Sequence, residues 1–203
     1  MENSKQVFFT VSLPRSGTAW LANYFTYGPS YCYHEPCVDC SSLDDLCRKI
    51  DNTPRKIVGV ADTMVPLFIP KIAKRYPSAK YIIITRPEDD VRLSLFKAGF
   101  NLNGFEHMKI AFESATKYIN DNVPYVAQVR EQHFSNLFKS GLPLWQFITK
   151  AGGNKFRDKQ LIDTRVEIIP QALGAKFNRE RNNSLLKEME LYQPQGSEDD
   201  SPT

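Results

Sequence analysis

The sequence predicts an α/β fold, in which helices cover both faces of a central parallel sheet of about five strands. Two observations support this prediction. Short apolar runs alternate along the chain with segments of helical periodicity. The runs are apolar at almost every position, which is typical of parallel strands buried on both faces. The 203 residues suffice for one such domain and are few for two, so we expect a single domain over residues 1–192.

Strands are predicted at residues 7–11, 56–61, 80–85, 125–129 and 165–169, which are rich in β-branched and aromatic side chains. The run at 80–85, Lys-Tyr-Ile-Ile-Ile-Thr, is the most apolar. It ends at Arg86-Pro87, because proline has no N–H to continue a hydrogen-bonded strand. Residues 31–40, which carry Tyr-His-Glu-Pro, are predicted to form a loop.

Helices are predicted at residues 18–27, 41–50, 65–75, 88–99, 105–120, 142–150, 156–163 and 185–191. The segment at 41–50 opens on a Ser-Ser-Leu-Asp-Asp capping pattern, and that at 88–99 opens on three acidic residues, which suit a helix N-terminus. In the third helix, Pro66 is compatible with a first turn, whereas Pro70 should kink the helix or delay its start. The acidic tail at 193–203 is rich in Pro, Ser and Asp and is predicted to be disordered.

A sharp turn, Leu-Pro-Arg-Ser-Gly-Thr at residues 13–18, lies between the first strand and the first helix. Pro14 fixes one φ angle there, and Gly17 permits an unusual one. The backbone N–H groups of such a turn and the helix N-terminus attract an anion. Arg15 adds a planar cation that suits phosphate or sulfate oxygens. The stretch therefore predicts a phosphate-binding turn.

This turn differs from the common nucleotide-triphosphate loop, G-x-x-x-x-G-K-[ST], in which the lysine reaches the phosphates and the hydroxyl binds magnesium. Here Arg15 precedes Gly17, and Ala19-Trp20 takes the place of the Lys-Ser/Thr pair. Because the magnesium-binding hydroxyl is missing, we expect the turn to hold phosphate without a metal ion.

The stretch Leu-Pro-Arg-Ser-Gly-Thr-Ala-Trp at 13–20 resembles the 5′-phosphosulfate loop of the sulfotransferases. The resemblance implies a three-layer α/β/α fold similar to that of the P-loop NTPases. It also implies 3′-phosphoadenosine 5′-phosphosulfate (PAPS) as the donor, adenosine 3′,5′-bisphosphate (PAP) as the product, and no metal. The residues that it assigns to donor binding are Arg15, Ser16, Gly17, Thr18, Ala19 and Trp20. The indole of Trp20 would stack on adenine, while Ala19 replaces a family threonine and so lacks its hydroxyl.

A second stretch, Thr-Arg-Pro-Glu-Asp-Asp-Val-Arg-Leu-Ser at 85–94, resembles the segment that binds the 3′-phosphate in the same family. Arg86 follows a predicted strand, at the sheet edge where parallel sheets bind ligands. The resemblance implies that Arg86 grips the 3′-phosphate by a charge-assisted contact and that the Ser94 hydroxyl donates a further bond. The family's Gly-x-x-Gly-x-x-Lys segment is not evident. The candidate sources of its charge are Gly174-Ala-Lys176 and the Arg179/Arg181 cluster, both within the basic residues 171–192.

Sulfuryl transfer needs a base for the acceptor proton and a positive charge for the leaving phosphate. Arg15 stands where the family has its catalytic Lys or Arg, and the resemblance assigns it the leaving-group charge. Glu35 is the favoured base, since tyrosylprotein sulfotransferases have a catalytic Glu at nearly the same distance after their loop Arg. Asp62, after the second predicted strand, and His34, beside Glu35, are the alternatives.

All four cysteines lie in one segment, as Cys32, Cys37, Cys40 and Cys47, with His34 between the first two. Such a cluster is compatible with a zinc site, with a disulfide or with reduced thiols. There is one tight Cys-x-x-Cys pair and no second pair at ligand spacing, so reduced thiols are the favoured interpretation.

The formal net charge of +3 is too small to favour nucleic acid as a partner, though it is compatible with a local basic pocket. No apolar run has the length of a membrane span, and the N-terminus lacks the pattern of a signal peptide. Golgi sulfotransferases carry a membrane anchor, and we find none here. We therefore expect a cytoplasmic enzyme.

The favoured function is a sulfotransferase that acts on a hydroxyl or amine of a small molecule or peptide. Two alternatives stay open at this point. One is a P-loop kinase of a small metabolite, and the other is a non-catalytic protein that binds the nucleotide and serves in interactions. The resemblance implies that variable loops build the acceptor pocket, here at 31–42 and 97–108, together with the basic C-terminal region.

Overall fold

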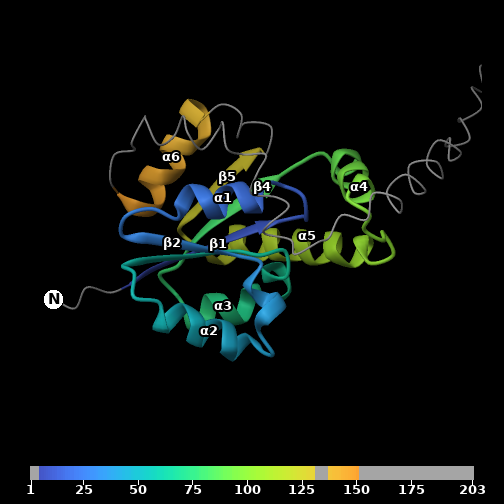
Figure 1. Ribbon diagram of the computed structural model, residues 1–203. Helices are drawn as coiled ribbons and strands as arrows, with labels where there is room; N and C mark the ends of the chain where they lie inside the picture. The colour runs from blue at the N-terminus through green and yellow to red at the C-terminus, as the bar shows by residue number, and fades with distance from the viewer. Residues whose placement is uncertain (1–4, 131–136, 151–203) are drawn as a thin grey trace, which may run out of the picture.

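The computed structural model describes residues 5–130 and 137–150. Within them, five strands form one parallel sheet in the order β2-β3-β1-β4-β5 (Figure 1). The strands are β1 (Gln6–Ser12), β2 (Ser30–His34), β3 (Ile57–Ala61), β4 (Lys80–Thr85) and β5 (Val126–Arg130). The central strand β1 pairs with β3 on one side and with β4 on the other. The predicted parallel sheet is confirmed.

Strand β2 corrects the sequence prediction. The strands predicted at 7–11, 56–61, 80–85 and 125–129 are confirmed with nearly the same bounds. The loop predicted at 31–40 is wrong in its first part, because Ser30–His34 pairs with β3 at the end of the described sheet. Its sequence, Ser-Tyr-Cys-Tyr-His, has no aliphatic run to mark it as a strand, since an end strand is only partly covered and needs fewer apolar residues. The strand predicted at 165–169 lies outside the described residues.

The described helices are α1 (Thr18–Phe25), α2 (Leu43–Asn52), α3 (Ile69–Arg75), α4 (Glu88–Lys97), α5 (Phe105–Asn122) and α6 (Leu137–Thr149). They confirm the helices predicted in these places. Two single 3-10 turns, η1 (Pro36–Asp39) and η2 (Val65–Phe68), precede α2 and α3. Pro70 delays the start of α3, as predicted, and the preceding turn is 3-10. The helices predicted at 156–163 and 185–191, the domain end at 192 and the acidic tail lie outside the described residues.

Neighbouring side chains of β1 point into two separate cores, which gives the molecule three layers. Phe8 packs on the side of α1 and α6, where its ring centroid lies 4.8 Å from that of Phe25. Phe9 packs on the other side with apolar residues of α2, α3 and α5. Figure 1 shows the same division of the helices between the two faces. Gly59 of β3 lies under Phe8, since a β-carbon there would come within 2.1 Å of the Phe8 ring.

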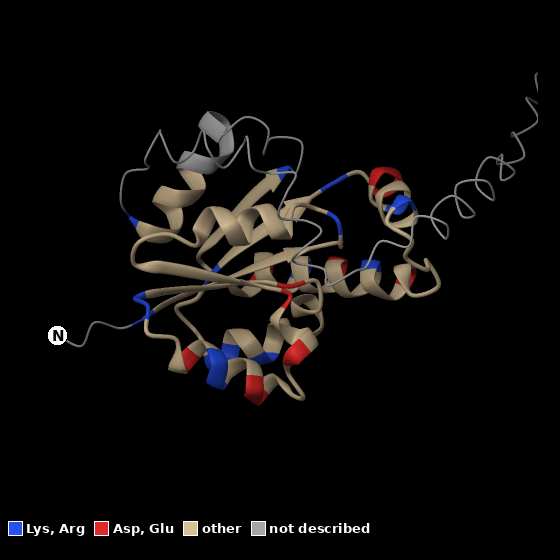
Figure 2. Ribbon diagram, viewed as in Figure 1, with Lys and Arg blue, Asp and Glu red and all other residues tan. Residues whose placement is uncertain are grey.

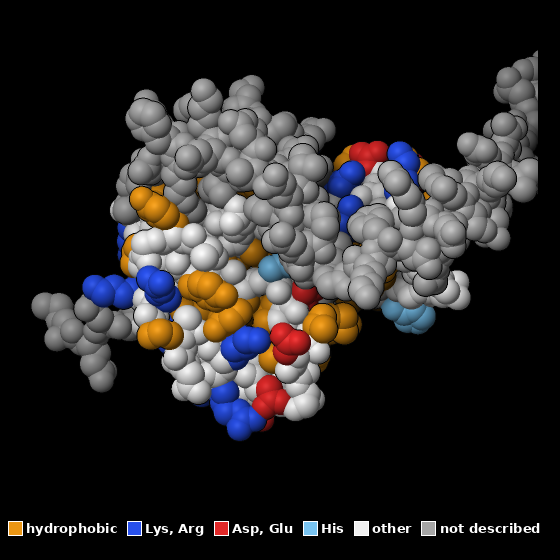
Figure 3. Space-filling view, viewed as in Figure 1, with side chains coloured by type: hydrophobic (Ala, Val, Ile, Leu, Met, Phe, Trp, Pro, Cys, Tyr) orange, Lys and Arg blue, Asp and Glu red, His pale blue; other side chains and the backbone are white. Residues whose placement is uncertain are grey.

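Because the strands are parallel, their carboxyl ends meet at one edge of the sheet. Figure 2 shows basic segments where β1 and β4 end and acidic segments near the ends of the neighbouring strands. Elsewhere on the face seen in Figure 3, charges of both signs are mixed among the described residues. Among these residues, no helix combines the length and the apolar character needed to cross a membrane.

Candidate active site

The predicted phosphate-binding turn joins β1 to α1 at the carboxyl edge of the sheet. Two of its residues have left-handed backbone conformations, Arg15 with a φ of 62° and Gly17 with a φ of 87°. Glycine adopts this conformation freely, whereas an arginine does so at a cost and is commonly held there by a functional loop. Ser16, between them, is fully buried, and its hydroxyl has no hydrogen-bond partner among the described residues. The turn thus offers a polar group that is positioned but unused.

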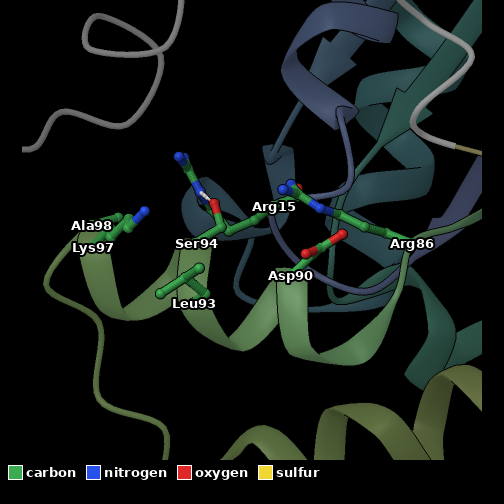
Figure 4. A pocket seen from close by; sticks show the side chains of 7 residues that line it. All are labelled: Arg15, Arg86, Asp90, Leu93, Ser94, Lys97 and Ala98. Carbon is green, nitrogen blue, oxygen red and sulfur yellow. Dashed lines mark hydrogen bonds between the residues drawn. The ribbon is translucent and has the colours of Figure 1, made fainter. Parts of the chain in front are cut away.

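Arg15 and Arg86 line the same pocket, although 71 residues separate them in the chain (Figure 4). Arg86 Nη1 donates a hydrogen bond to the carbonyl oxygen of Arg15. Arg15 Nε in turn donates to Ser94 Oγ at 3.1 Å. Burial, and then the positive charge of Arg86, lower the pKa of Arg15. Two cations held together in this way favour an anionic ligand between them.

The pocket has a volume of about 280 Å³. Its lining residues are Arg15, Arg86, Asp90, Leu93, Ser94, Lys97 and Ala98. Asp90 and Lys97 were not predicted, and both belong to α4, on the same helical face as Ser94. Figure 4 shows Lys97 and Arg15 extending to the same side of α4. Helical periodicity counted from Ser94 is the sequence signal that could have identified both residues.

The three candidate bases come together at the neighbouring ends of β2 and β3. His34 ends β2 opposite Ala61, the last residue of β3. Glu35 follows His34, and Asp62 follows Ala61. Glu35 Oε2 accepts hydrogen bonds from the backbone N–H of Thr63 at 3.1 Å and from its hydroxyl at 3.0 Å. This cluster could not be foreseen, because the pairing of β2 with β3 was not predicted.

His34 links this cluster to the phosphate-binding turn. Its Nε2 lies 3.3 Å from the hydroxyl oxygen of Thr18, the first residue of α1, and 3.9 Å from Glu35 Oε1. Burial lowers the pKa of His34, and the charge of Asp62 acts in the opposite direction. The carboxyl groups therefore lie close to the turn that carries Arg15.

Glu35 has the electrostatic properties of a base. Burial first, and then the negative charge of Asp62, raise its pKa to about 7, while the two hydrogen bonds from Thr63 act in the opposite direction. A carboxyl group with a pKa near neutrality is a stronger base than an ordinary carboxylate and is still partly ionised at neutral pH. Asp62 is fully buried, and both its oxygens already accept backbone hydrogen bonds, so the geometry favours Glu35.

Trp20 lies in the core beside the turn. Its side chain is 7 % exposed, and its ring stacks on Tyr24 with centroids 5.0 Å apart. Tyr24 therefore occupies one face of the indole, and stacking of adenine on Trp20 stays a prediction. Ala19 is half-buried and offers no side-chain hydrogen bond.

The four cysteines, Cys32, Cys37, Cys40 and Cys47, are free thiols. Among the described residues, no group of three His, Cys, Asp or Glu side chains is arranged to hold a metal ion. Burial raises the pKa of Cys32, Cys37 and Cys40, so these thiols are poor nucleophiles at neutral pH.

No protein-family model and no curated protein sequence matches the chain. Solved structures do match. Mouse sulfotransferase SULT7A1, solved in complex with PAP, is similar with a TM-score of 0.55 and 16% sequence identity. The match covers 81% of this chain and 64% of the mouse chain, so the protein spans less than two thirds of that enzyme.

A sulfotransferase from Alicyclobacillus acidocaldarius matches with a TM-score of 0.48 and 13% identity, over 91% of this chain and 96% of the bacterial one. At such identities the mouse match shows the fold alone. The chain has the α/β fold of a sulfotransferase, as the resemblance of its two motifs implied.

Proposed function

We propose that the protein is a sulfotransferase that moves the sulfuryl group of PAPS to an acceptor hydroxyl or amine. The observation that carries this proposal is the pocket shared by Arg15, Arg86 and Ser94. These residues belong to two distant motifs that resemble donor-binding segments, and the fold is that of a sulfotransferase. The mouse neighbour was solved with PAP, the expected product.

The residues present suit a donor that carries phosphate at both ends of a nucleoside. The turn holds a buried serine hydroxyl without a partner among the described residues, together with a cation. Arg86 and Ser94 supply the second anion-binding set, and Arg86 is fixed against the turn by its bond to the Arg15 carbonyl. We assign the 5′-phosphosulfate to the turn and the 3′-phosphate to Arg86 and Ser94.

The roles in catalysis follow from the chemistry of each side chain. When bound, the donor supplies an activated sulfuryl group. Glu35, in its ionised form, takes the proton of the acceptor group, whose oxygen or nitrogen forms the new bond to sulfur as the bond between sulfur and the phosphate oxygen breaks. Arg15 and the N–H groups of the turn stabilise the charge that develops on that phosphate. Arg15 keeps its own proton, because a guanidinium is too weak an acid to release it.

A thermal-shift measurement separates this function from the alternatives. We expect PAP to raise the melting temperature without magnesium, since binding to the native state alone stabilises it. ATP with magnesium should have little effect. Stabilisation by magnesium-ATP but not by PAP would instead favour a kinase. Binding of PAP without sulfuryl transfer from PAPS to a broad set of acceptors would favour a non-catalytic protein.

A further inference from the structure

Asp62 joins the two segments that follow β2 and β3. It is fully buried directly after β3. Its Oδ2 accepts a hydrogen bond from the backbone N–H of Cys37 at 2.7 Å, and its Oδ1 accepts one from the N–H of Met64 at 2.7 Å. Cys37 lies 25 residues away, on the segment after β2. Charge-assisted bonds of this length are strong, and a buried carboxylate requires them. One side chain therefore ties two turns together.

Glu35 lies between these two points of attachment. It precedes Cys37 by two residues, and its hydrogen-bond donor Thr63 directly precedes Met64. The N–H of Glu35 donates to the carbonyl oxygen of Ala61 at 3.0 Å. Its φ of 48° is in the left-handed region, which a glutamate adopts only where the surrounding contacts impose it. The hydrogen bonds that Asp62 accepts from Cys37 and Met64 lie on both sides of this residue in the fold.

We propose that Asp62 is a positioning residue for Glu35. Its carboxylate fixes both turns, so that it sets the place of the Glu35 carboxyl group and the electrostatic field around it. This inference rests on the proposed function only where it names Glu35 as the base. Asp62 was an alternative base in the sequence analysis. The inference gives it a positioning role instead, since both its oxygens accept hydrogen bonds from backbone N–H groups.

The charges around Glu35 support this role. The titratable groups that face it are His34 at the end of β2, Cys37 in η1 and Asp62 after β3. The negative charge of Asp62 opposes ionisation of Glu35, and burial does so more strongly. The N–H and hydroxyl of Thr63 favour the ionised form. Removing the charge of Asp62 should therefore lower the pKa of Glu35, and removing the Thr63 hydroxyl should raise it.

The test is a direct titration of Glu35 in the full chain by NMR of its labelled side-chain carboxyl carbon, with Glu35→Gln assigning the signal. Asp62→Asn should lower the midpoint by about one pH unit or more, a size typical of one nearby charge. Thr63→Val should raise it, because a hydrogen bond to the charged form is lost. Asp44→Asn is the matched control, since Asp44 is an exposed acid on α2.

The acid limb of kcat/KM for sulfuryl transfer should move with the midpoint. An unchanged midpoint in Asp62→Asn, accompanied only by lower thermal stability, would reduce Asp62 to a structural residue and overturn the proposal. If Asp62→Asn does not fold, Asp62→Glu replaces it. Moving the carboxylate by one methylene should shift the Glu35 midpoint, and an unchanged midpoint would equally overturn the proposal. The titration does not require turnover. A wild-type protein that transfers no sulfuryl group would contradict the proposed function, and the titration would still test the role of Asp62.

Discussion

Glu35 is a carboxyl group whose chemistry is set by its surroundings. Burial and the charge of Asp62 raise its pKa to about 7, from an ordinary value of 4.5. The same residue in an exposed loop would be fully ionised at neutral pH and would be a weak base. Its place after the last residue of an end strand keeps it half-buried and next to His34, which contacts Thr18 of the phosphate-binding turn.

Glu35→Gln should lower kcat by roughly 10²- to 10⁴-fold, the usual contribution of a general base. Binding of PAP should be unchanged, because we assign the 3′- and 5′-phosphate contacts to other residues. In the wild type, kcat/KM should rise with pH up to about 7, the pKa of Glu35, and then level off. Steady-state rates across this range check the prediction. Unchanged turnover in the variant would move the base to His34.

The same substitution has a thermodynamic consequence that needs no activity. A raised pKa means that the folded state binds the Glu35 proton more tightly than the unfolded state does. Its contribution to stability is therefore present below pH 4.5 and lost as the pH rises toward about 7. The melting temperature of Glu35→Gln, relative to the wild type, should increase over this interval. A constant difference would show that the Glu35 pKa is ordinary.

Helix α4 is fixed so that one face is presented to the pocket. On its other side, Arg92 Nε donates to Glu88 at 2.9 Å, and the Arg92 guanidinium lies 4.2 Å from the ring centroid of Phe105 in α5. Lys109 of α5 also pairs with Glu88 at 2.7 Å. These contacts hold α4 on α5 and leave Ser94 facing Arg15.

Lys97 and Asp90 lie on that face of α4 and should have opposite effects on the affinity for the donor. Lys97→Met should weaken PAP binding, and Asp90→Asn should strengthen it, because each changes the charge of the pocket wall. We expect changes of roughly 2- to 5-fold in Kd, since exposed charges interact by less than about 1 kcal/mol. Isothermal titration at low and high salt checks this, and both effects should shrink at high salt. A change of the same sign in both variants would contradict it.

The helices and strands that could be predicted are those marked by a pattern within a short stretch of sequence. The run at 80–85 contains Tyr and three Ile in a row, so β4 was found with its bounds, whereas Ser30–His34 has no aliphatic run and is predicted as a loop. Arg15, Arg86 and Ser94 were predicted as site residues by motif, and the structure brings them to one pocket. The role that we propose for Asp62 could not be predicted, because it depends on β2 lying beside β3, and no local sequence pattern gives the strand order.

At the scale of the molecule, the strand order determines which turns meet. β1 is central, so its turn has the end of β4 on one side and the end of β3 on the other. The β4 side carries Arg86 and contributes cations, and the β3 side carries Asp62 and contributes carboxyl groups. A donor and an acceptor could thus approach one turn from opposite sides.

Arg15 and Arg86 together are proposed to hold one doubly phosphorylated adenosine. Isothermal titration of PAP and of adenosine 5′-monophosphate, with the wild type and Arg86→Ala, tests it most directly. Lys74→Ala, which removes an exposed charge on α3, is the control. We expect one PAP per chain, bound more tightly than the monophosphate, and roughly a 10- to 100-fold loss of PAP affinity in Arg86→Ala, the worth of one charged contact. The affinity for the monophosphate should fall far less in Arg86→Ala. Equal affinities of the wild type for both nucleotides, or an equal loss of both in Arg86→Ala, would contradict the claim.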